Sequence, residues 1–109
     1  MATLLVCGCM QSKPPLPGKE SDAKAQVENW VPIGTPMADA QRTMEQHGFK
    51  CEVRKNGEWG AMKGVDFIHC DFSEQPGEGT VVLTRWQVAL FLENSKVKSE
   101  DVVIQFTGP

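Results

Sequence analysis

At 109 residues the chain has room for one small domain, and such a domain buries a smaller share of its surface than a large one. The formal charge of -3 comes from 11 basic and 14 acidic side chains spread along the chain, so no basic stripe suits a phosphate backbone and nucleic acid is not expected as a partner. No apolar run approaches the roughly 20 residues that cross a bilayer, so the sequence predicts no transmembrane helix.

Two cysteines end the first segment of the chain. A short apolar run, TLLV, precedes Cys7, Gly8 and Cys9. An apolar stretch, a small residue and then a cysteine resemble the lipobox of bacterial lipoproteins, and the resemblance implies that cleavage leaves Cys9 as the lipid-carrying N-terminus. Residues 1–9 are therefore expected to be a truncated lipoprotein signal. The run is short beside the usual 7–15 apolar residues and lacks a basic residue before it, which suggests a true start upstream of Met1. The alternative is a frayed N-terminus with two free thiols.

The next segment is rich in proline. Residues 10–21 hold three prolines, a glycine and several charged or hydroxyl side chains, which is the composition of a semi-rigid extended tether. A lipid, a tether and then a folded domain form a consistent order. We therefore expect one small domain over 22–109.

Two helices are predicted at the start of this domain. The first spans 22–30 with Asp22 as its N-cap, and the proline that follows in 31–34 ends it. The second spans 35–47, with Thr35 as the cap and a proline at the first helical position. Its apolar face consists of Met37, Ala40, Met44 and His47. Gly48 is expected as the left-handed residue of a Schellman ending, with Phe49 against Met44.

An antiparallel hairpin is predicted over 49–72, where apolar and polar residues alternate. Placing Cys51 opposite Cys70 also pairs Val53 with Ile68, Phe49 with Phe72, Lys55 with Asp66, and Trp59 with Met62. Gly60 and Ala61 remain as a two-residue turn with glycine first, as a type II′ turn requires.

The same register predicts a disulfide between Cys51 and Cys70. Opposed residues have Cα atoms about 4.5–5.5 Å apart, which overlaps the range of a disulfide, and the bridge would contribute about 3 kcal/mol. Oxidation requires an exported compartment, which agrees with the lipobox. The alternative is a pair of buried free thiols. Neither cysteine lies in a C-x-x-C motif, so no zinc site is expected.

The remaining sequence predicts a turn-rich connection over 73–79, a long strand over 82–92, a turn within 92–97 and a last short strand over 102–106. Helices followed by antiparallel strands predict an α+β fold, with two N-terminal helices packed on one face of a three- to four-stranded antiparallel sheet.

The helix start Gly34-Thr35-Pro36-Met37, the stop at Gly48 and the alternating strand from Trp86 together resemble the small lipoproteins of the outer-membrane assembly BamE/SmpA-like fold. That family has a glycine-led helix pair followed by a three-stranded antiparallel sheet. The resemblance implies a fold and a location in the bacterial envelope. It implies no role in outer-membrane assembly, because the chain departs from the family by carrying Cys51 and Cys70.

Few residues are candidates for a functional site. His69 and Asp71 share a strand face, which is expected to be polar and solvated. His47 is expected to interact with the last carbonyls of its helix. Trp59 near the hairpin tip is a candidate interaction residue, and burial over the sheet edge is an equal alternative.

The chain offers no motif set of nucleophile, base and stabiliser, so no enzyme is predicted. We expect an envelope-anchored lipoprotein that faces the periplasm and acts as a non-catalytic binding or scaffolding module, with an envelope protein as partner and no metal, cofactor or small-molecule substrate. One alternative is a soluble periplasmic or secreted inhibitor-like domain that uses the hairpin loop. Another is a thiol or metal carrier that uses Cys7 and Cys9.

Overall fold

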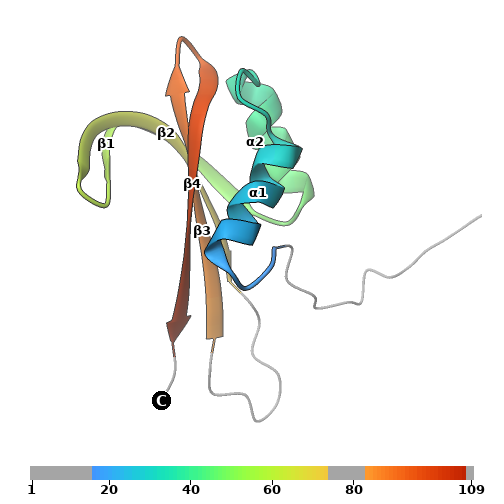
Figure 1. The fold of residues 1–109 in the computed structure, drawn as a ribbon. Helices are drawn as coiled ribbons and strands as arrows, with labels where there is room; N and C mark the ends of the chain where they lie inside the picture. The colour runs from blue at the N-terminus through green and yellow to red at the C-terminus, as the bar shows by residue number, and fades with distance from the viewer. Residues whose placement is uncertain (1–15, 74–82, 108–109) are drawn as a thin grey trace, which may run out of the picture.

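The computed structural model describes residues 16–73 and 83–107, which form two helices followed by four strands (Figure 1). The elements in chain order are α1 (Glu20–Trp30), α2 (Met37–Gln46), β1 (Lys50–Trp59), β2 (Met62–Ser73), β3 (Leu83–Glu93) and β4 (Lys96–Thr107). Each strand pairs antiparallel with the next, so the strand order is β1-β2-β3-β4. The predicted α+β class and antiparallel sheet are confirmed, with four strands.

Several predictions fall on residues outside this range. The signal at 1–9, the lipidation of Cys9 and the first part of the tether all precede residue 16, and most of the connection expected at 73–79 lies within 74–82. Among the described helices, none is both long and apolar enough to cross a membrane.

The end of α2 forms as the sequence predicts. Gly48 has a φ of +94°, the left-handed conformation that glycine adopts at no steric cost. The Gly48 N–H donates to the carbonyl of Glu45, and the Phe49 N–H donates to the carbonyl of Met44. These two hydrogen bonds define the Schellman ending.

Both helix starts differ from the prediction. α1 begins at Glu20 rather than at Asp22, because the Glu20 carboxylate accepts a hydrogen bond from the backbone N–H of Ile104 on β4 and so fixes the first turn. α2 has Pro36 as its N-cap residue, and the hydroxyl of Thr35 donates to the carbonyl of Pro32 instead of capping the helix. Neither helix therefore begins with a side-chain cap.

The last part of the expected tether belongs to the folded domain. Leu16 is buried in the core, and the indole N–H of Trp86 donates to the carbonyl of Pro17 over 3.0 Å. These contacts hold Leu16 and Pro17 against the domain. The folded part consequently begins before residue 22.

The hairpin register is confirmed. Cys51 pairs with Cys70, and the same register is present again at the tip, where Trp59 pairs with Met62. Gly60 has a φ of +57°, as the first residue of a type II′ turn requires. One expected pair inside the hairpin, Lys55 with Asp66, does not form, because the register shifts at this point. The expected pair of Phe49 with Phe72 is not part of the ladder, because β1 begins at Lys50.

Two compensating irregularities explain the missing pair. Between Arg54 and Gly57, β1 carries one residue more than β2, and Gly64 then adds one residue to β2. Asn56 adopts a positive φ of 53°, and its N–H donates to Oδ1 of Asp66. Because bulges increase the local twist and bend of a strand pair, the far end of the hairpin bends out of the plane of the sheet on the side opposite the helices (Figure 1).

The main core is one cluster of buried residues that come from both helices and from one face of the strands. Ala23 and Val27 of α1, together with Ala40 and Met44 of α2, are fully buried. They belong to one cluster with the strand residues Ile68, Cys70, Val88, Leu90 and Val102. Burying a side chain the size of Met44 contributes about 1.5–3 kcal/mol, so this cluster accounts for much of the stability of a small domain.

A second cluster occupies the other face of the strands. Phe67, Ala89 and Phe91 are buried there, and Trp59 and Val65 from the curved hairpin pack against them. We call this strand face the His69 face. His69 lies on it because it follows Phe67 by two positions on β2, and alternate residues of a strand share a face. The hairpin therefore supplies its own apolar cover to a face that the sequence predicts to be polar.

The last strand is longer than predicted, because β4 begins at Lys96 instead of at residue 102. The turn before it contains Asn94 and Ser95 with φ values of 54° and 64°, which suits a two-residue hairpin loop. Backbone hydrogen bonds between Val97 and the 34–35 segment tie the start of β4 to the entry of α2. Residues 96–101 are mostly charged or polar, so the sequence pattern did not predict a strand there.

Candidate ligand-binding site

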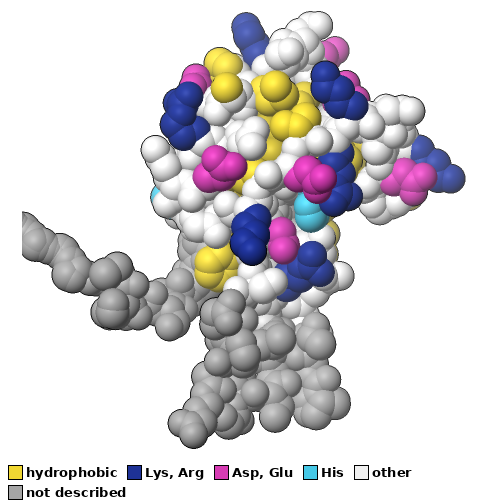
Figure 2. All heavy atoms as spheres, turned by 180° about the vertical axis from the view of Figure 1, so that it is seen from behind, with side chains coloured by type: hydrophobic (Ala, Val, Ile, Leu, Met, Phe, Trp, Pro, Cys, Tyr) yellow, Lys and Arg dark blue, Asp and Glu magenta, His cyan; other side chains and the backbone are white. Residues whose placement is uncertain are grey.

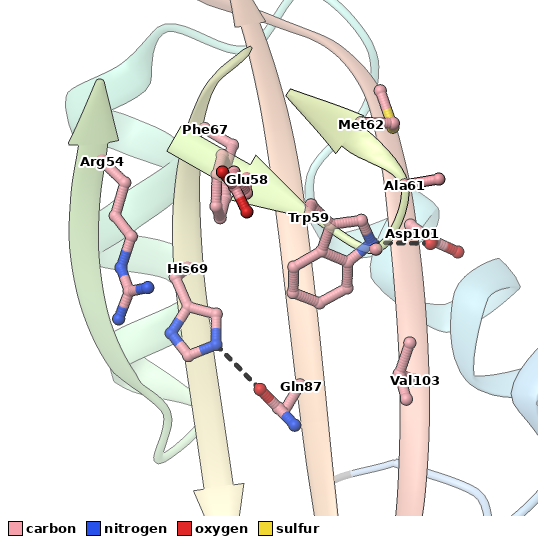
Figure 3. A pocket seen from close by; sticks show the side chains of 11 residues that line it. Arg54, Glu58, Trp59, Ala61, Met62, Phe67, His69, Gln87, Asp101 and Val103 are labelled. Carbon is pink, nitrogen blue, oxygen red and sulfur yellow. Dashed lines mark hydrogen bonds between the residues drawn. The ribbon is translucent and has the colours of Figure 1, made fainter. Parts of the chain in front are cut away.

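A cavity of about 460 Å³ lies on the His69 face beneath the curved hairpin (Figure 3). Its walls come from all four strands. The lining residues include Arg54 and Trp59 on β1, Met62 and His69 on β2, Gln87 on β3, and Val103 on β4. Cavities of about 300–1,000 Å³ with mixed apolar and polar walls are typical of ligand sites.

Trp59 forms one wall and is held in place from several sides. Its indole N–H donates to Oδ2 of Asp101 over 2.8 Å. The ring meets Phe67 and Phe91 edge-to-face, with centroid distances of 5.9 and 6.5 Å. Oδ1 of Asp101 accepts from the N–H of Val102, which fixes the carboxylate in turn. The indole is therefore oriented before any ligand arrives.

The curvature of the hairpin explains why Trp59 reaches this face. Gly57 passes so close to Phe67 that a Cβ at this position would lie 3.2 Å from Cε1 of that ring. A larger residue would push the strand away from the aromatic cluster. The glycine and the neighbouring bulge at Asn56 therefore allow the end of β1 to fold over the sheet.

A chain of hydrogen bonds leads from Gln105 to the cavity residues Gln87 and His69. Nε2 of Gln87 donates to Oε1 of Gln105 over 2.7 Å. Oε1 of Gln87 therefore faces His69, whose Nε2 lies 3.0 Å away and donates to it. In the neutral ring this leaves Nδ1 of His69 as an acceptor, and on protonation Nδ1 becomes a donor.

Arg54 lies beside His69 on the same face (Figure 3). Its Nη2 and Nε donate to Oε1 of Glu52 over 3.1 and 3.3 Å. The Arg54 and Glu52 side chains are 47% and 67% exposed, and ion pairs in such a setting contribute at most about 1 kcal/mol. The guanidinium can therefore exchange Glu52 for another acceptor at low cost.

Charges of both signs alternate around the site. Nε of Arg85 donates to Oδ1 of Asp71 over 2.6 Å on the same face. Figure 2 shows Asp and Glu side chains interspersed with Lys and Arg side chains over the described surface that is seen from behind. Neither sign forms a continuous field there.

The histidines predicted as weak candidates have structural partners. His69 and Asp71 share the His69 face, as predicted, and they contact Gln87 and Arg85 respectively. The ring of His47 stacks on Trp30 with a centroid distance of 3.6 Å and an interplanar angle of 8°. Its main contact is therefore an aromatic ring of α1, which the sequence did not indicate.

The two described cysteines lie side by side. Sγ of Cys51 and Sγ of Cys70 are 3.0 Å apart, and both are free thiols in the structure. The hydrogen bond with Cys51, followed by burial, raises the pKa of the Cys70 thiol far above its usual range. The disulfide stays a prediction.

Glu100 is a buried acid that the sequence did not single out. Its side chain is 4% exposed, and neither carboxylate oxygen has a hydrogen-bond partner within the described part of the chain. Burial and then the negative charge of Glu28, against the opposing effect of Lys24, raise the pKa of Glu100 to about 7. Alternation along β4 would have placed this residue on the core face, but the charge argued against that position.

Within residues 16–73 and 83–107, no group of three or more His, Cys, Asp or Glu side chains is arranged to hold a metal ion. Comparison of the chain with protein-family models, with curated proteins and with solved structures gave no match. The function is therefore argued from the cavity itself.

Proposed function

We propose that the protein is a non-catalytic binding module of the bacterial cell envelope, and that the cavity beside Trp59 is its recognition site. One observation carries this proposal. Trp59 is a large amphipathic side chain, fixed by Asp101 and by two aromatic rings, that forms the wall of an open cavity. Tryptophan and arginine are enriched among the residues that dominate binding energy.

The polar groups of the cavity favour binding over catalysis. His69 engages Gln87, and both oxygens of Asp101 accept hydrogen bonds from Trp59 and Val102. A general base must reach a nucleophile or a substrate proton, whereas these groups support the walls of the site. Preorganised walls reduce the ordering cost of association.

The location is part of the same proposal. A lipid on Cys9 would anchor the domain to the membrane and face it toward the periplasm, with an envelope protein as the partner. The resemblance to the BamE/SmpA-like fold supports this location through its order of helices and sheet, although the four strands exceed the three that the resemblance implies. We further propose that α1 and α2 cover one sheet face, which leaves the His69 face for the partner; the shared core cluster supports this arrangement (Figure 1).

Site-specific photo-crosslinking in native membranes tests the binding proposal. A photoreactive amino acid at Met62, which lines the cavity and is 44% exposed, should give a discrete crosslinked product. The same amino acid at Arg42 on α2, also exposed, serves as the matched control and should give none. Equal products from both positions, or none from Met62, would contradict the proposal.

Mass spectrometry of the protein from membranes tests the location separately. Diacylglycerol on Cys9, with Cys7 absent, is the expected result. A mature chain without lipid in the soluble fraction would favour the inhibitor-like alternative, and an intact Met1 with bound metal would favour the carrier.

A further inference from the structure

We propose that the cavity recognises a segment of its partner that places a carboxylate next to an aromatic side chain. This inference rests on the proposed binding function and adds the chemistry of the ligand. The ring would pack against Trp59, and the carboxylate would bind the guanidinium of Arg54.

The two sides of the cavity are chemically different. Figure 3 shows the indole of Trp59 on one side, with Met62 and Ala61 above it, and the guanidinium of Arg54 beside the His69 ring on the other. A ligand that fills the cavity therefore meets an apolar wall and a polar wall together. Aromatic pairs contribute beyond the area that they bury, which favours a ring on the Trp59 side.

The hydrogen-bonding capacity of the polar wall favours an anion. Arg54 has five N–H donors, and the structure engages Nε and Nη2 with a single oxygen of the exposed Glu52. Of the acids that line the cavity, Asp101 already accepts two hydrogen bonds. Glu58 is exposed at the curved end of the hairpin, and its negative charge opposes the binding of an anionic ligand.

The surface next to this wall carries charges of both signs. A hollow of about 260 Å³ shares Arg54 and His69 with the cavity. Its charged lining consists of three basic side chains, Lys50, Arg54 and Arg85, against two acidic ones, Glu52 and Asp71. Both acids are already paired with an arginine. Because Arg54 already lines the cavity, the hollow adds two basic and two acidic side chains whose charges balance, so the guanidinium of Arg54 is the group that a carboxylate would bind.

Four capped dipeptides test ring and charge independently. The probes are acetyl-Phe-Glu-amide, acetyl-Phe-Gln-amide, acetyl-Phe-Lys-amide and acetyl-Ala-Glu-amide, titrated into ¹⁵N-labelled full chain. The readout is the indole N–H signal of Trp59, with the indoles of Trp30 and Trp86 as internal controls, because neither lines the cavity. The Phe-Glu probe should move the Trp59 signal with a dissociation constant of roughly 0.1–1 mM, and the other three should bind about tenfold more weakly.

Three variants test the charge assignment. Arg54→Gln should weaken the Phe-Glu probe about tenfold, because it removes the charge-assisted hydrogen bonds. Glu58→Gln should strengthen the same probe, because it removes the competing negative charge. Arg42→Gln makes the same chemical change as the first variant on α2, away from the cavity, and should leave binding unchanged.

The outcomes separate this inference from the proposed function. Tighter binding of the Phe-Lys probe, with weakening by Glu58→Gln, would show a cation site and overturn the inference. Equal binding of all four probes would also overturn it, because the site would then not distinguish ligands by their charge or by their aromatic ring. If no probe binds while the Met62 crosslink persists, the ligand chemistry is wrong and the binding function stands. If no probe binds and the Met62 crosslink is also absent, both proposals are wrong.

Discussion

The indole N–H of Trp59 donates to Asp101 over 2.8 Å and thereby links β1 to β4, although β2 and β3 lie between these strands in the sheet. The two edge strands meet because the hairpin curves over the His69 face. This contact closes one side of the cavity. This single hydrogen bond therefore stabilises the curved hairpin and also holds one wall of the cavity.

Removing the donor should destabilise the protein measurably. Trp59→Phe keeps an aromatic ring against Phe67 and Phe91 but removes the N–H, and we expect the free energy of unfolding to fall by about 1–2 kcal/mol. A double-mutant cycle with Asp101→Ala, followed by urea unfolding, should give a coupling energy of about 1 kcal/mol. Additive effects within about 0.5 kcal/mol would show that the contact contributes nothing.

The disulfide can be tested by its effect on stability. Protein isolated from an oxidising compartment should lack the mass of two hydrogens, and reduction should lower the free energy of unfolding by about 3 kcal/mol, because the closed loop restricts the unfolded chain. The double variant of Cys51→Ala and Cys70→Ala is the control, since reductant should not affect it. If reductant leaves the wild-type chain unchanged, the two sulfurs that lie 3.0 Å apart are free thiols in the native protein.

Glu100 should make stability depend on pH. The unfolded chain releases this proton near the ordinary pKa of 4.5, whereas burial in the folded chain raises the pKa to about 7. As the pH rises from 4.5 to 7, the unfolded state ionises first, so the free energy of unfolding should fall by about 3 kcal/mol. Stability from this group is therefore present at acidic pH and lost near neutrality.

Substitution by a neutral isostere isolates this effect. Glu100→Gln should remove the decline between pH 4.5 and 7 and raise stability at pH 8, as measured by urea unfolding across that range. Glu93→Gln, at an exposed position on β3, is the matched control and should leave the pH profile of the wild type in place. A profile that Glu100→Gln does not change would contradict the assignment.

The Schellman ending of α2 gives a further prediction. Gly48→Ala places a Cβ at a φ of +94° and 3.4 Å from Cε2 of Phe72, so the free energy of unfolding should fall by about 1 kcal/mol or more. Gly18→Ala is the control, since nothing lies within 4 Å of its Cβ and its φ is not positive. Thermal unfolding should show a lower midpoint for the first variant alone; equal shifts would argue against a strained left-handed position.

The elements that could be predicted were those with a strong local pattern. Gly48 marked the end of α2, and the cross-strand pairs of Cys51 with Cys70 and of Trp59 with Met62 fixed the hairpin register. The two bulges between these pairs cancel each other, so the register at the tip was right although the path between was not. The alternation of apolar and polar residues predicts which residues pair. It does not reveal an extra residue in one strand when an extra residue in the other strand restores the register.

The parts that failed depend on contacts distant in sequence. The start of α1 is set by a hydrogen bond from Ile104 to Glu20, 84 positions apart, and no local cap indicates it. Trp59 stood out as an aromatic near a turn, but Asp101 lies 42 positions away, and its role follows only from the curvature of the hairpin. The site residues therefore became recognisable once the strands were placed.

The Met62 crosslink, repeated in a chain that carries Trp59→Leu, tests the central claim most directly. The substitution removes the indole from the cavity wall and leaves the probe position at the rim. If the cavity is the recognition site, the crosslinked product seen with Trp59 should be lost, while the circular dichroism of the purified variant remains that of a folded chain. A folded Trp59→Leu chain that gives an undiminished product from Met62 would contradict the account.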